Sequence, residues 1–144
     1  MTDYSELLKE GRIRRGRFSR DQAENCLKLA SRDIETAKAT LVTSAEWAFN
    51  IAYNAMHQAG RAYMFKKGYR TIGEGHHATV IMFLGTALGT DFRDALIVME
   101  HMRRQRNRAT YDTTGTITTR HAEEAIDAAV HLVRAIRQCL ATEE

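Results

Sequence analysis

The sequence predicts an all-α protein, built as an antiparallel bundle of four to five helices. Proline is absent from all 144 residues, while strong helix formers such as alanine, leucine, arginine and glutamate are abundant. Apolar residues recur at three- and four-residue spacing, as in helices that bury one face. Hydrophobic residues at 44% and charged residues at 27% are typical of a folded chain rather than a disordered one. We therefore expect a single helical domain over residues 1–144.

Two helices are predicted before residue 42. Asp3–Glu10 has the pattern of a short helix, and Gly11 ends it. Ser19 and Gln22 form a capping box, in which side chains satisfy the free N–H groups of a helix start. The apolar positions that follow are Ala23, Leu27, Ala30, Ile34, Ala37 and Leu41. This stripe predicts a long helix with one buried face.

The next helix is predicted to lie at the centre of the bundle. Thr43 and Glu46 make a second capping box directly after the first long helix, so the connecting turn is short and the two helices must be antiparallel. From about Ser44 to Lys67 the segment is apolar on more than one side, which is typical of a buried helix. Gly68 ends it, and Tyr69–Gly75 is expected to be a polar loop.

Three further helices complete the predicted bundle. One spans about His76–Leu88 and is closed by Gly89, and Asp91 then caps a helix that carries an arginine cluster. The threonine-rich segment Thr113–Thr119 connects this helix to the last one. The apolar face of the last helix consists of Ala122, Ile126, Ala129, Val133, Ile136 and Leu140. No internal repeat or low-complexity tract suggests a second domain.

Composition excludes several classes of protein. The first residues, MTDYSELLKEG, are acidic and lack the apolar core of a signal peptide, and no apolar run is long enough to span a membrane. We expect a cytoplasmic protein. Cys26 and Cys139 fall on apolar stripes and are expected to be buried structural thiols. Because no cysteines and histidines cluster at metal-ligand spacing, we expect neither a metal nor a cofactor.

The most informative stretch is RRQRNRATYD, at Arg103–Asp112. Upstream of it an apolar stripe runs through Leu96, Met99 and Met102, and the same spacing next places Arg106 on the inward face. A buried arginine needs a partner, because an unpaired buried charge is very costly. Such a conflict between pattern and residue type is expected at a functional site.

The side chains of this stretch suit phosphate better than acid–base catalysis. Guanidinium groups bind phosphate through paired hydrogen bonds, and an amide and a phenol can hold or stack a base. Arginine stays protonated, and tyrosine ordinarily titrates near pH ~10. The predicted RNA- or nucleotide-binding residues are Arg103, Arg104, Arg106, Asn107, Arg108 and Asp112. Arg106 and Tyr111 are the predicted catalytic pair, but they lie about 140° apart on a regular helix, so we expect the helix to fray near Tyr111.

Other polar and aromatic residues are expected to have structural roles. His57, His76 and His77 could reach a site, but adjacent histidines diverge on a helix, and we favour structural or surface roles for them. Tyr53, Tyr63 and Trp47 fit core or interface packing better than base stacking. The basic cluster Arg12–Arg17 either solvates a surface or binds phosphate, and the sequence does not choose between the two.

Arg106, Asn107 and the residues after them carry a family resemblance. The stretch resembles the motif of HEPN domains, a helical-bundle superfamily of prokaryotic toxins, defence RNases and nucleotide-binding modules. In that motif an arginine, often followed by asparagine, precedes a histidine near the end of the penultimate helix, and here Tyr111 stands where the histidine would be. The segment AYNAMHQAGRAYMFKKGYR at Ala52–Arg70 and the following GHHATVIMFL are similar to the preceding helices of the superfamily.

The resemblance implies a HEPN-like bundle that forms a homodimer with a shared cleft between its arginine-bearing helices. In active members the arginine holds the phosphate and the histidine transfers a proton, so that RNA is cut without a metal. Some members pair with a minimal nucleotidyltransferase as toxin and antitoxin. The replacement of histidine by Tyr111 weakens the expectation of cleavage and leaves phosphate binding in place.

Three interpretations of the arginine stretch follow from the sequence. The first is an RNA- or nucleotide-binding protein, with weak or lost ribonuclease activity and a role in toxin–antitoxin or defence systems. The second is a non-enzymatic interaction subunit that pairs with a nucleotidyltransferase or another helical protein, its arginines meeting carboxylates. In the third, Arg106 is simply paired inside the bundle with Glu100, Asp94 or an acid on another helix.

Overall fold

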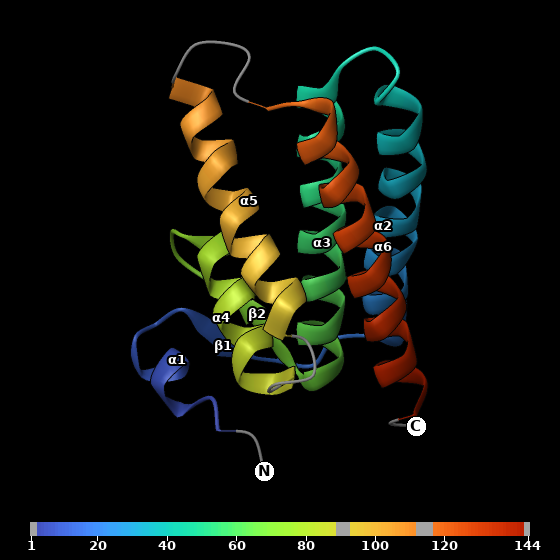
Figure 1. Ribbon diagram of the computed structural model, residues 1–144. Helices are drawn as coiled ribbons and strands as arrows, with labels where there is room; N and C mark the ends of the chain where they lie inside the picture. Colours follow the sequence, from blue (N-terminus) through green and yellow to red (C-terminus); the bar gives the residue numbers. More distant parts are fainter. Residues whose placement is uncertain (1–2, 89–92, 112–116, 143–144) are drawn as a thin grey trace.

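The chain folds as a helical bundle arranged around one long central helix. The computed structural model describes residues 3–88, 93–111 and 117–142, but not the side chains at 88, 106–111 and 142. Six helices and two short strands are seen in these ranges: α1 (Ser5–Lys9), β1 (Ile13–Arg15), α2 (Arg20–Thr40), α3 (Ala45–Lys67), β2 (Tyr69–Thr71), α4 (His76–Leu88), α5 (Arg93–Tyr111) and α6 (Thr119–Thr142) (Figure 1). The predicted all-α fold class is confirmed.

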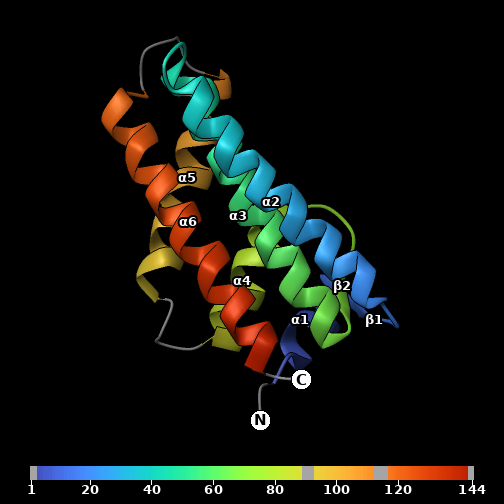
Figure 2. The same cartoon turned by 90° about the vertical axis from the view of Figure 1, so that its right-hand side faces the viewer.

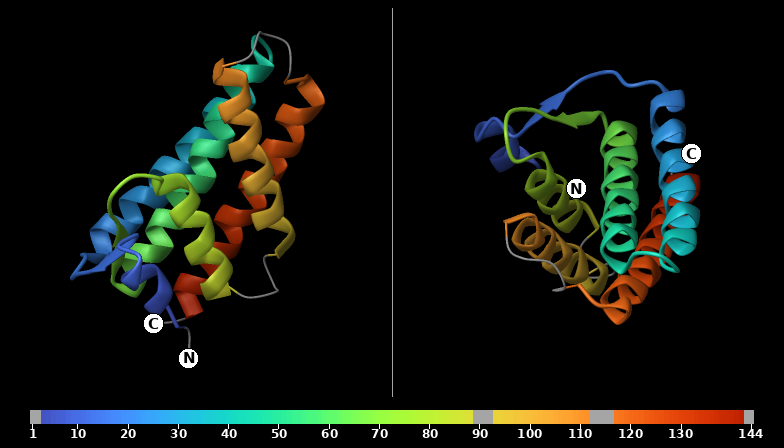
Figure 3. Two further views of the ribbon diagram at one scale, coloured as in Figure 1. Left: turned by 90° about the vertical axis from the view of Figure 1, so that its left-hand side faces the viewer. Right: turned by 90° about the horizontal axis from the view of Figure 1, so that it is seen from above.

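Helix α3 is the centre of the bundle. It packs most extensively against α2 and α6, and it also contacts α4 and α5. Viewed from above, α4 and α5 lie on the opposite side of α3 from α2 (Figure 3), while α2 and α6 cover its other faces (Figure 2). The largest fully buried side chains of α3 are Tyr53, Phe49, Met56 and Met64. The expectation of a central helix that is apolar on several sides is therefore correct.

Local signals determine the ends of the long helices. The capping box of α2 is formed as predicted, because the Ser19 hydroxyl accepts from Gln22 N at 3.1 Å and Gln22 Oε1 accepts from Ser19 N at 2.8 Å. Helix α3 is capped one residue later than predicted: Ser44, rather than Thr43, accepts from Trp47 N at 3.2 Å. Gly68 ends α3 with φ +88°, a backbone conformation that favours glycine.

A two-stranded sheet replaces part of the predicted loop at Tyr69–Gly75. Strand β2 pairs antiparallel with β1, with Ile13 opposite Thr71 and Arg15 opposite Tyr69. The chain leaves α3 at Gly68 and is held there by a hydrogen bond from Gly16 N to Gly68 O at 3.0 Å. This pairing fixes the segment that leads into α4, and it places part of the predicted basic cluster on a strand.

The predicted cap Asp91 and the predicted stop Gly89 lie outside the described residues. Cys26 is buried as expected, and burial raises the pKa of its thiol, opposed by the positive charge of Arg61. Cys139 is half-buried, and neither cysteine forms a disulfide. Within the described ranges, no helix is long and apolar enough to cross a membrane.

Candidate functional site: an arginine- and histidine-lined cavity

A large cavity lies where α3, β2, α4 and α5 meet. Its volume is about 1020 Å³, near the upper end of the range for small-molecule sites, about 300–1,000 Å³. Its cationic side chains are Arg61 from α3, Arg70 from β2 and Arg103 from α5, and its histidines are His57, His76 and His77. No aspartate or glutamate is among the described residues that line it. We name it the arginine cavity.

Helix geometry and one turn bring these side chains together. His57 and Arg61 are four residues apart, so they lie on the same face of α3. The left-handed Gly68 ends α3 and directs the chain into β2, which contributes Arg70. The Arg61 guanidinium is oriented by two contacts, a hydrogen bond to Gln58 Oε1 at 3.2 Å and a position 5.3 Å from the Phe65 ring centre.

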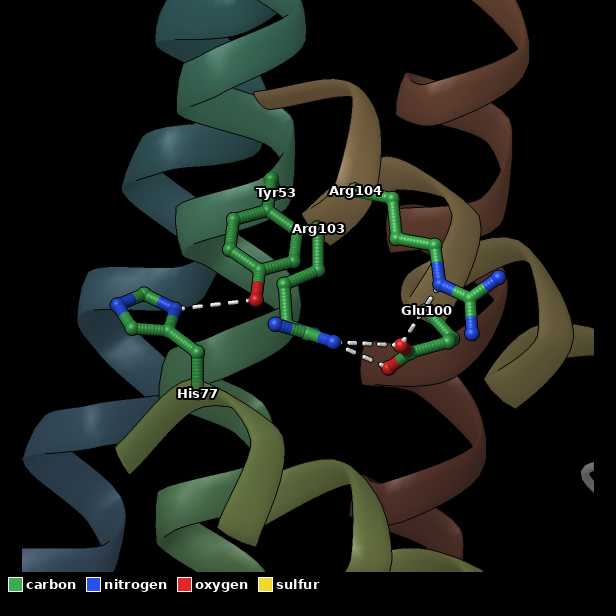
Figure 4. A network of polar contacts seen from close by, with 5 residues as sticks. All are labelled: Tyr53, His77, Glu100, Arg103 and Arg104. Atoms are coloured by element: carbon green, nitrogen blue, oxygen red, sulfur yellow. Dashed lines mark hydrogen bonds and ion pairs between the residues drawn. The ribbon is translucent and has the colours of Figure 1, made fainter. Parts of the chain in front are cut away.

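The histidines form an ordered group on one wall of the cavity. The rings of His57 and His77 stack, with 4.2 Å between their centres and 20° between their planes. His77 Nδ1 shares a hydrogen bond of 3.0 Å with the hydroxyl of Tyr53, which is 1% exposed (Figure 4). His76 Nδ1 shares a hydrogen bond of 3.0 Å with the hydroxyl of Thr71 on β2. The two adjacent histidines therefore diverge, as expected, but the cavity includes both.

Arg103 reaches the cavity from α5 and is held by Glu100 one turn earlier. Its Nε and Nη2 donate to the two carboxylate oxygens of Glu100 at 3.2 and 2.7 Å, while Arg104 Nε donates to the same carboxylate at 3.3 Å. Figure 4 shows the Arg103 guanidinium between Tyr53 and Glu100. The hydrogen bonds from Arg103 lower the pKa of Glu100, and the same contact raises the pKa of Arg103. Both groups are charged at neutral pH.

Comparison with known proteins agrees with this architecture. The sequence profile of the HEPN domain matches residues 16–139. The chain belongs to the HEPN domain family. An archaeal HEPN homologue, ST0689, superposes with a TM-score of 0.65 at 20% identity, covering 83% of this chain and 98% of that one. TT1696 from Thermus thermophilus gives a TM-score of 0.62 at 19% identity, covering 81% and 97%. These two likenesses are of fold alone, and no curated protein matches the chain.

The structure of this HEPN domain separates the predicted site residues into three groups. Arg103 lines the arginine cavity, and its side chain is 27% exposed. Arg104 lies outside the cavity lining and is 70% exposed. The side chains of Arg106, Asn107, Arg108 and Tyr111, and all of Asp112, lie outside the described residues.

Two predictions concern this helix: that it frays near Tyr111, and that Arg106 pairs with an acid such as Glu100. Helix α5 continues to Tyr111, so the described backbone does not fray before that residue. Glu100, one of the acids expected to pair with Arg106, holds Arg103 and Arg104, and the side chain of Arg106 lies outside the described residues. Of the arginines in this stretch whose side chains are described, Arg103 lines the cavity, and it lies one turn before Arg106, the residue that the apolar spacing indicated.

The sequence reasoning did not place the histidines at a site. One signal was present: His57 and Arg61 put an imidazole and a guanidinium on one face of a helix that is otherwise rich in apolar residues. The other partners could not be found locally, because Arg70, His77 and Arg103 meet only through tertiary packing. Among the described residues, no group of three or more histidine, cysteine, aspartate or glutamate side chains has the arrangement of a metal site.

Proposed function

We propose that this HEPN protein binds RNA or a nucleotide, with phosphate held in the arginine cavity. The observation that carries the proposal is the cavity lining itself. Arg61, Arg70 and Arg103 converge there from three elements, with histidines beside them and no carboxylate among the described lining residues. Guanidinium groups match the oxygens of a phosphate in geometry and charge.

The binding surface is proposed to extend from the cavity along α5. Arg104 is exposed one residue after Arg103, and its guanidinium is accessible to an anion. The remaining residues of this proposed surface are Arg106, Asn107, Arg108 and Asp112, which follow on the same helix or directly after it. A single phosphate would occupy part of the cavity, whereas a longer RNA would also meet the arginines further along α5.

Binding of a fluorescent single-stranded RNA at several salt concentrations tests this proposal. Arg61→Ala and Arg103→Ala should weaken binding and each reduce the salt dependence, by a slope of about 0.7 per lost phosphate contact. Arg106→Ala should do the same if the surface extends along α5. Arg120→Ala is the matched control, because Arg120 is 88% exposed on α6 and pairs with Glu124. Unchanged affinity and unchanged salt slope in folded Arg61→Ala and Arg103→Ala would refute the proposal.

Metal-independent RNA cleavage is a second candidate function, favoured by the histidines. An imidazole beside a phosphate held by arginine can take the proton of a ribose 2′-hydroxyl, which an arginine cannot do. Arg106 and Tyr111 remain the proposed catalytic residues of the motif, and His57 or His77 would supply the proton transfer that Tyr111 performs poorly. Gel analysis of the same RNA samples with EDTA present separates cleavage from binding alone.

The proposed partners are a second copy of the chain or a nucleotidyltransferase in a toxin–antitoxin pair. Exposed apolar side chains support an interaction role: Ile97 on α5 is 59% exposed and Met82 on α4 is 42% exposed. In this interpretation the arginines would meet carboxylates of the partner. RNA binding itself separates the two interpretations: affinity for single-stranded RNA that falls steeply with salt supports the first, and a folded protein that binds no RNA supports the second.

A further inference from the structure

A second, smaller cavity shares His77 with the arginine cavity. Its volume is about 330 Å³, at the lower end of the range for small-molecule sites, about 300–1,000 Å³. Its wall is formed by α2 and α3, together with His77 at the start of α4. The lining residues are Asp33, Trp47, Asn50, Ile51, Tyr53, Asn54 and His77. His77 therefore borders both cavities, which are neighbours.

Two polar groups of this cavity, the Asp33 carboxylate and Asn50 Oδ1, are hydrogen-bond acceptors. Asp33 is 7% exposed, and its two carboxylate oxygens accept from Asn54 Nδ2 at 2.8 Å and from Arg32 Nη2 at 3.2 Å. A carboxylate oxygen can accept more than one hydrogen bond. Asn50 Oδ1 is buried and accepts no hydrogen bond from any residue that the structure describes. A buried acceptor without a donor is costly, so the cavity favours a ligand with N–H groups.

Trp47 supplies an aromatic wall at the same place. Its side chain is 65% exposed, although tryptophan normally loses most of its surface in a folded protein. Of the predicted core or interface residues, Tyr53 and Tyr63 are buried in the core, whereas Trp47 is outside it. An exposed indole beside hydrogen-bonding groups is the arrangement by which proteins stack and read an unpaired base.

The positive charge of the neighbouring arginines disfavours a cationic ligand in this cavity. A guanidinium or ammonium group would also satisfy a carboxylate and stack on an indole. Arg32 already pairs with Asp33, however, and the neighbouring cavity holds Arg61, Arg70 and Arg103. A cation would be repelled by these arginines, whereas a neutral base attached to a phosphate suits both cavities.

We propose that the second cavity binds a guanine base whose phosphate occupies the arginine cavity, an inference that rests on the proposed function. Guanine presents the N1–H and N2–H donors side by side, which complements Asp33 and Asn50 Oδ1. Adenine and cytosine place a ring-nitrogen acceptor beside their amino group, and uracil places carbonyl oxygens beside N3–H. These acceptors would face the carboxylate of Asp33, so the other bases are disfavoured.

Tryptophan fluorescence tests the proposal directly, because Trp47 is the single tryptophan of the chain. Titration with guanosine 5′-monophosphate should quench the fluorescence, as expected for a base stacked on the indole. Adenosine, cytidine and uridine 5′-monophosphates should bind at least about tenfold more weakly, since a paired base contact discriminates by that order. Guanidinium chloride at low millimolar concentration should not compete.

Two variants examine the base contacts. Asp33→Asn should lower the ratio of guanosine to adenosine monophosphate affinity by about tenfold or more. The matched control is Glu35→Gln, which removes an exposed carboxylate from the same helix and should keep the preference. Asn50→Leu should also weaken guanosine monophosphate binding without lowering thermal stability, because it removes a buried acceptor that has no donor among the described residues. This second variant keeps the test valid if Asp33→Asn does not fold.

Ribose 5-phosphate, measured by calorimetry, separates this inference from the proposed function. If ribose 5-phosphate and all four nucleotides bind equally and the fluorescence is unchanged, the guanine assignment is wrong and phosphate binding stands. If ribose 5-phosphate, the nucleotides and single-stranded RNA all fail to bind the folded protein, the proposed function fails as well. Competition by guanidinium would instead assign the second cavity to a cationic group, which also overturns the proposal.

Discussion

Replacing Gly60 by alanine should destabilise the bundle where α4 packs on α3. A Cβ at Gly60 would lie 2.4 Å from Val80 Cγ1 and 3.1 Å from Leu84 Cδ1. Non-bonded carbon atoms normally lie about 3.5–4.0 Å apart, so the contact to Val80 must open by roughly 1 Å. Val80 and Leu84 are both 0% exposed and have little room to move. Overpacking of this kind costs roughly 1–3 kcal/mol.

The matched control is Gly85→Ala on α4. A Cβ there would be 3.8 Å from Leu96 Cδ1, an ordinary contact. Alanine is favoured over glycine inside a helix by about 1 kcal/mol, and both variants share this gain. We therefore expect Gly85→Ala to be more stable than wild type, and Gly60→Ala to have a lower free energy of unfolding than Gly85→Ala by about 1–3 kcal/mol.

Urea denaturation followed by circular dichroism measures this difference. Because helix propensity cancels between the two variants, what remains reports the packing of α4 against α3. Equal stability of Gly60→Ala and Gly85→Ala would refute the reasoning, since it would mean that Val80 and Leu84 do not approach Gly60 closely. The result bears on the site as well, because the same packing holds His76 and His77 over the arginine cavity.

Two further predictions concern a cap and an ion pair. Ser44→Ala should lower the free energy of unfolding by about 1 kcal/mol, because the Ser44 hydroxyl caps α3. Thr43→Ala should lower it by less. If urea denaturation shows a larger loss for Thr43→Ala, Thr43 is the capping residue and the prediction is wrong. Glu100→Gln should cost roughly 0.5–1 kcal/mol at neutral pH, since the carboxylate holds Arg103 and Arg104. The folded-state pKa of Glu100 is lowered, so its contribution is present above the unfolded-state pKa and is lost as pH falls through the folded-state value. Denaturation of wild type and Glu100→Gln should therefore converge in acid, and a gap that is independent of pH would contradict this.

The fold could be predicted because its signals are local. The Ser19 capping box, the Gly68 stop and the apolar stripes each lie within a few residues of sequence, and each is found in the structure. The sheet was missed because its strands are three residues each and distant in sequence, too short to show an alternating pattern. The cap of α3 was misplaced by one residue because Thr43 and Ser44 are both competent caps and only tertiary structure chooses between them.

The candidate site was only partly predictable for a different physical reason. An arginine among apolar helix positions is visible in sequence, and this pattern indicated α5, whose Arg103 lines the arginine cavity. The arginine and histidine side chains that line the cavity with Arg103 come from α3, β2 and α4, so their proximity to Arg103 depends on tertiary packing and not on sequence spacing. Histidine carries no comparable local signal, because it is tolerated both on surfaces and in cores.

Arg103 links the basic stretch of α5 to the arginine cavity. It belongs to the RRQRNRATYD stretch, and it is also the α5 residue that lines the arginine cavity. Glu100 neutralises part of its charge and holds its guanidinium, which lies beside Tyr53. The Tyr53 hydroxyl shares a hydrogen bond with His77, which lines both cavities. A helix rises about 1.5 Å per residue, so the arginines that follow are carried away from the cavity one turn at a time. The proposed phosphate-binding surface thus extends from the arginine cavity, which would hold one phosphate, to the basic residues further along α5, which would bind a longer strand.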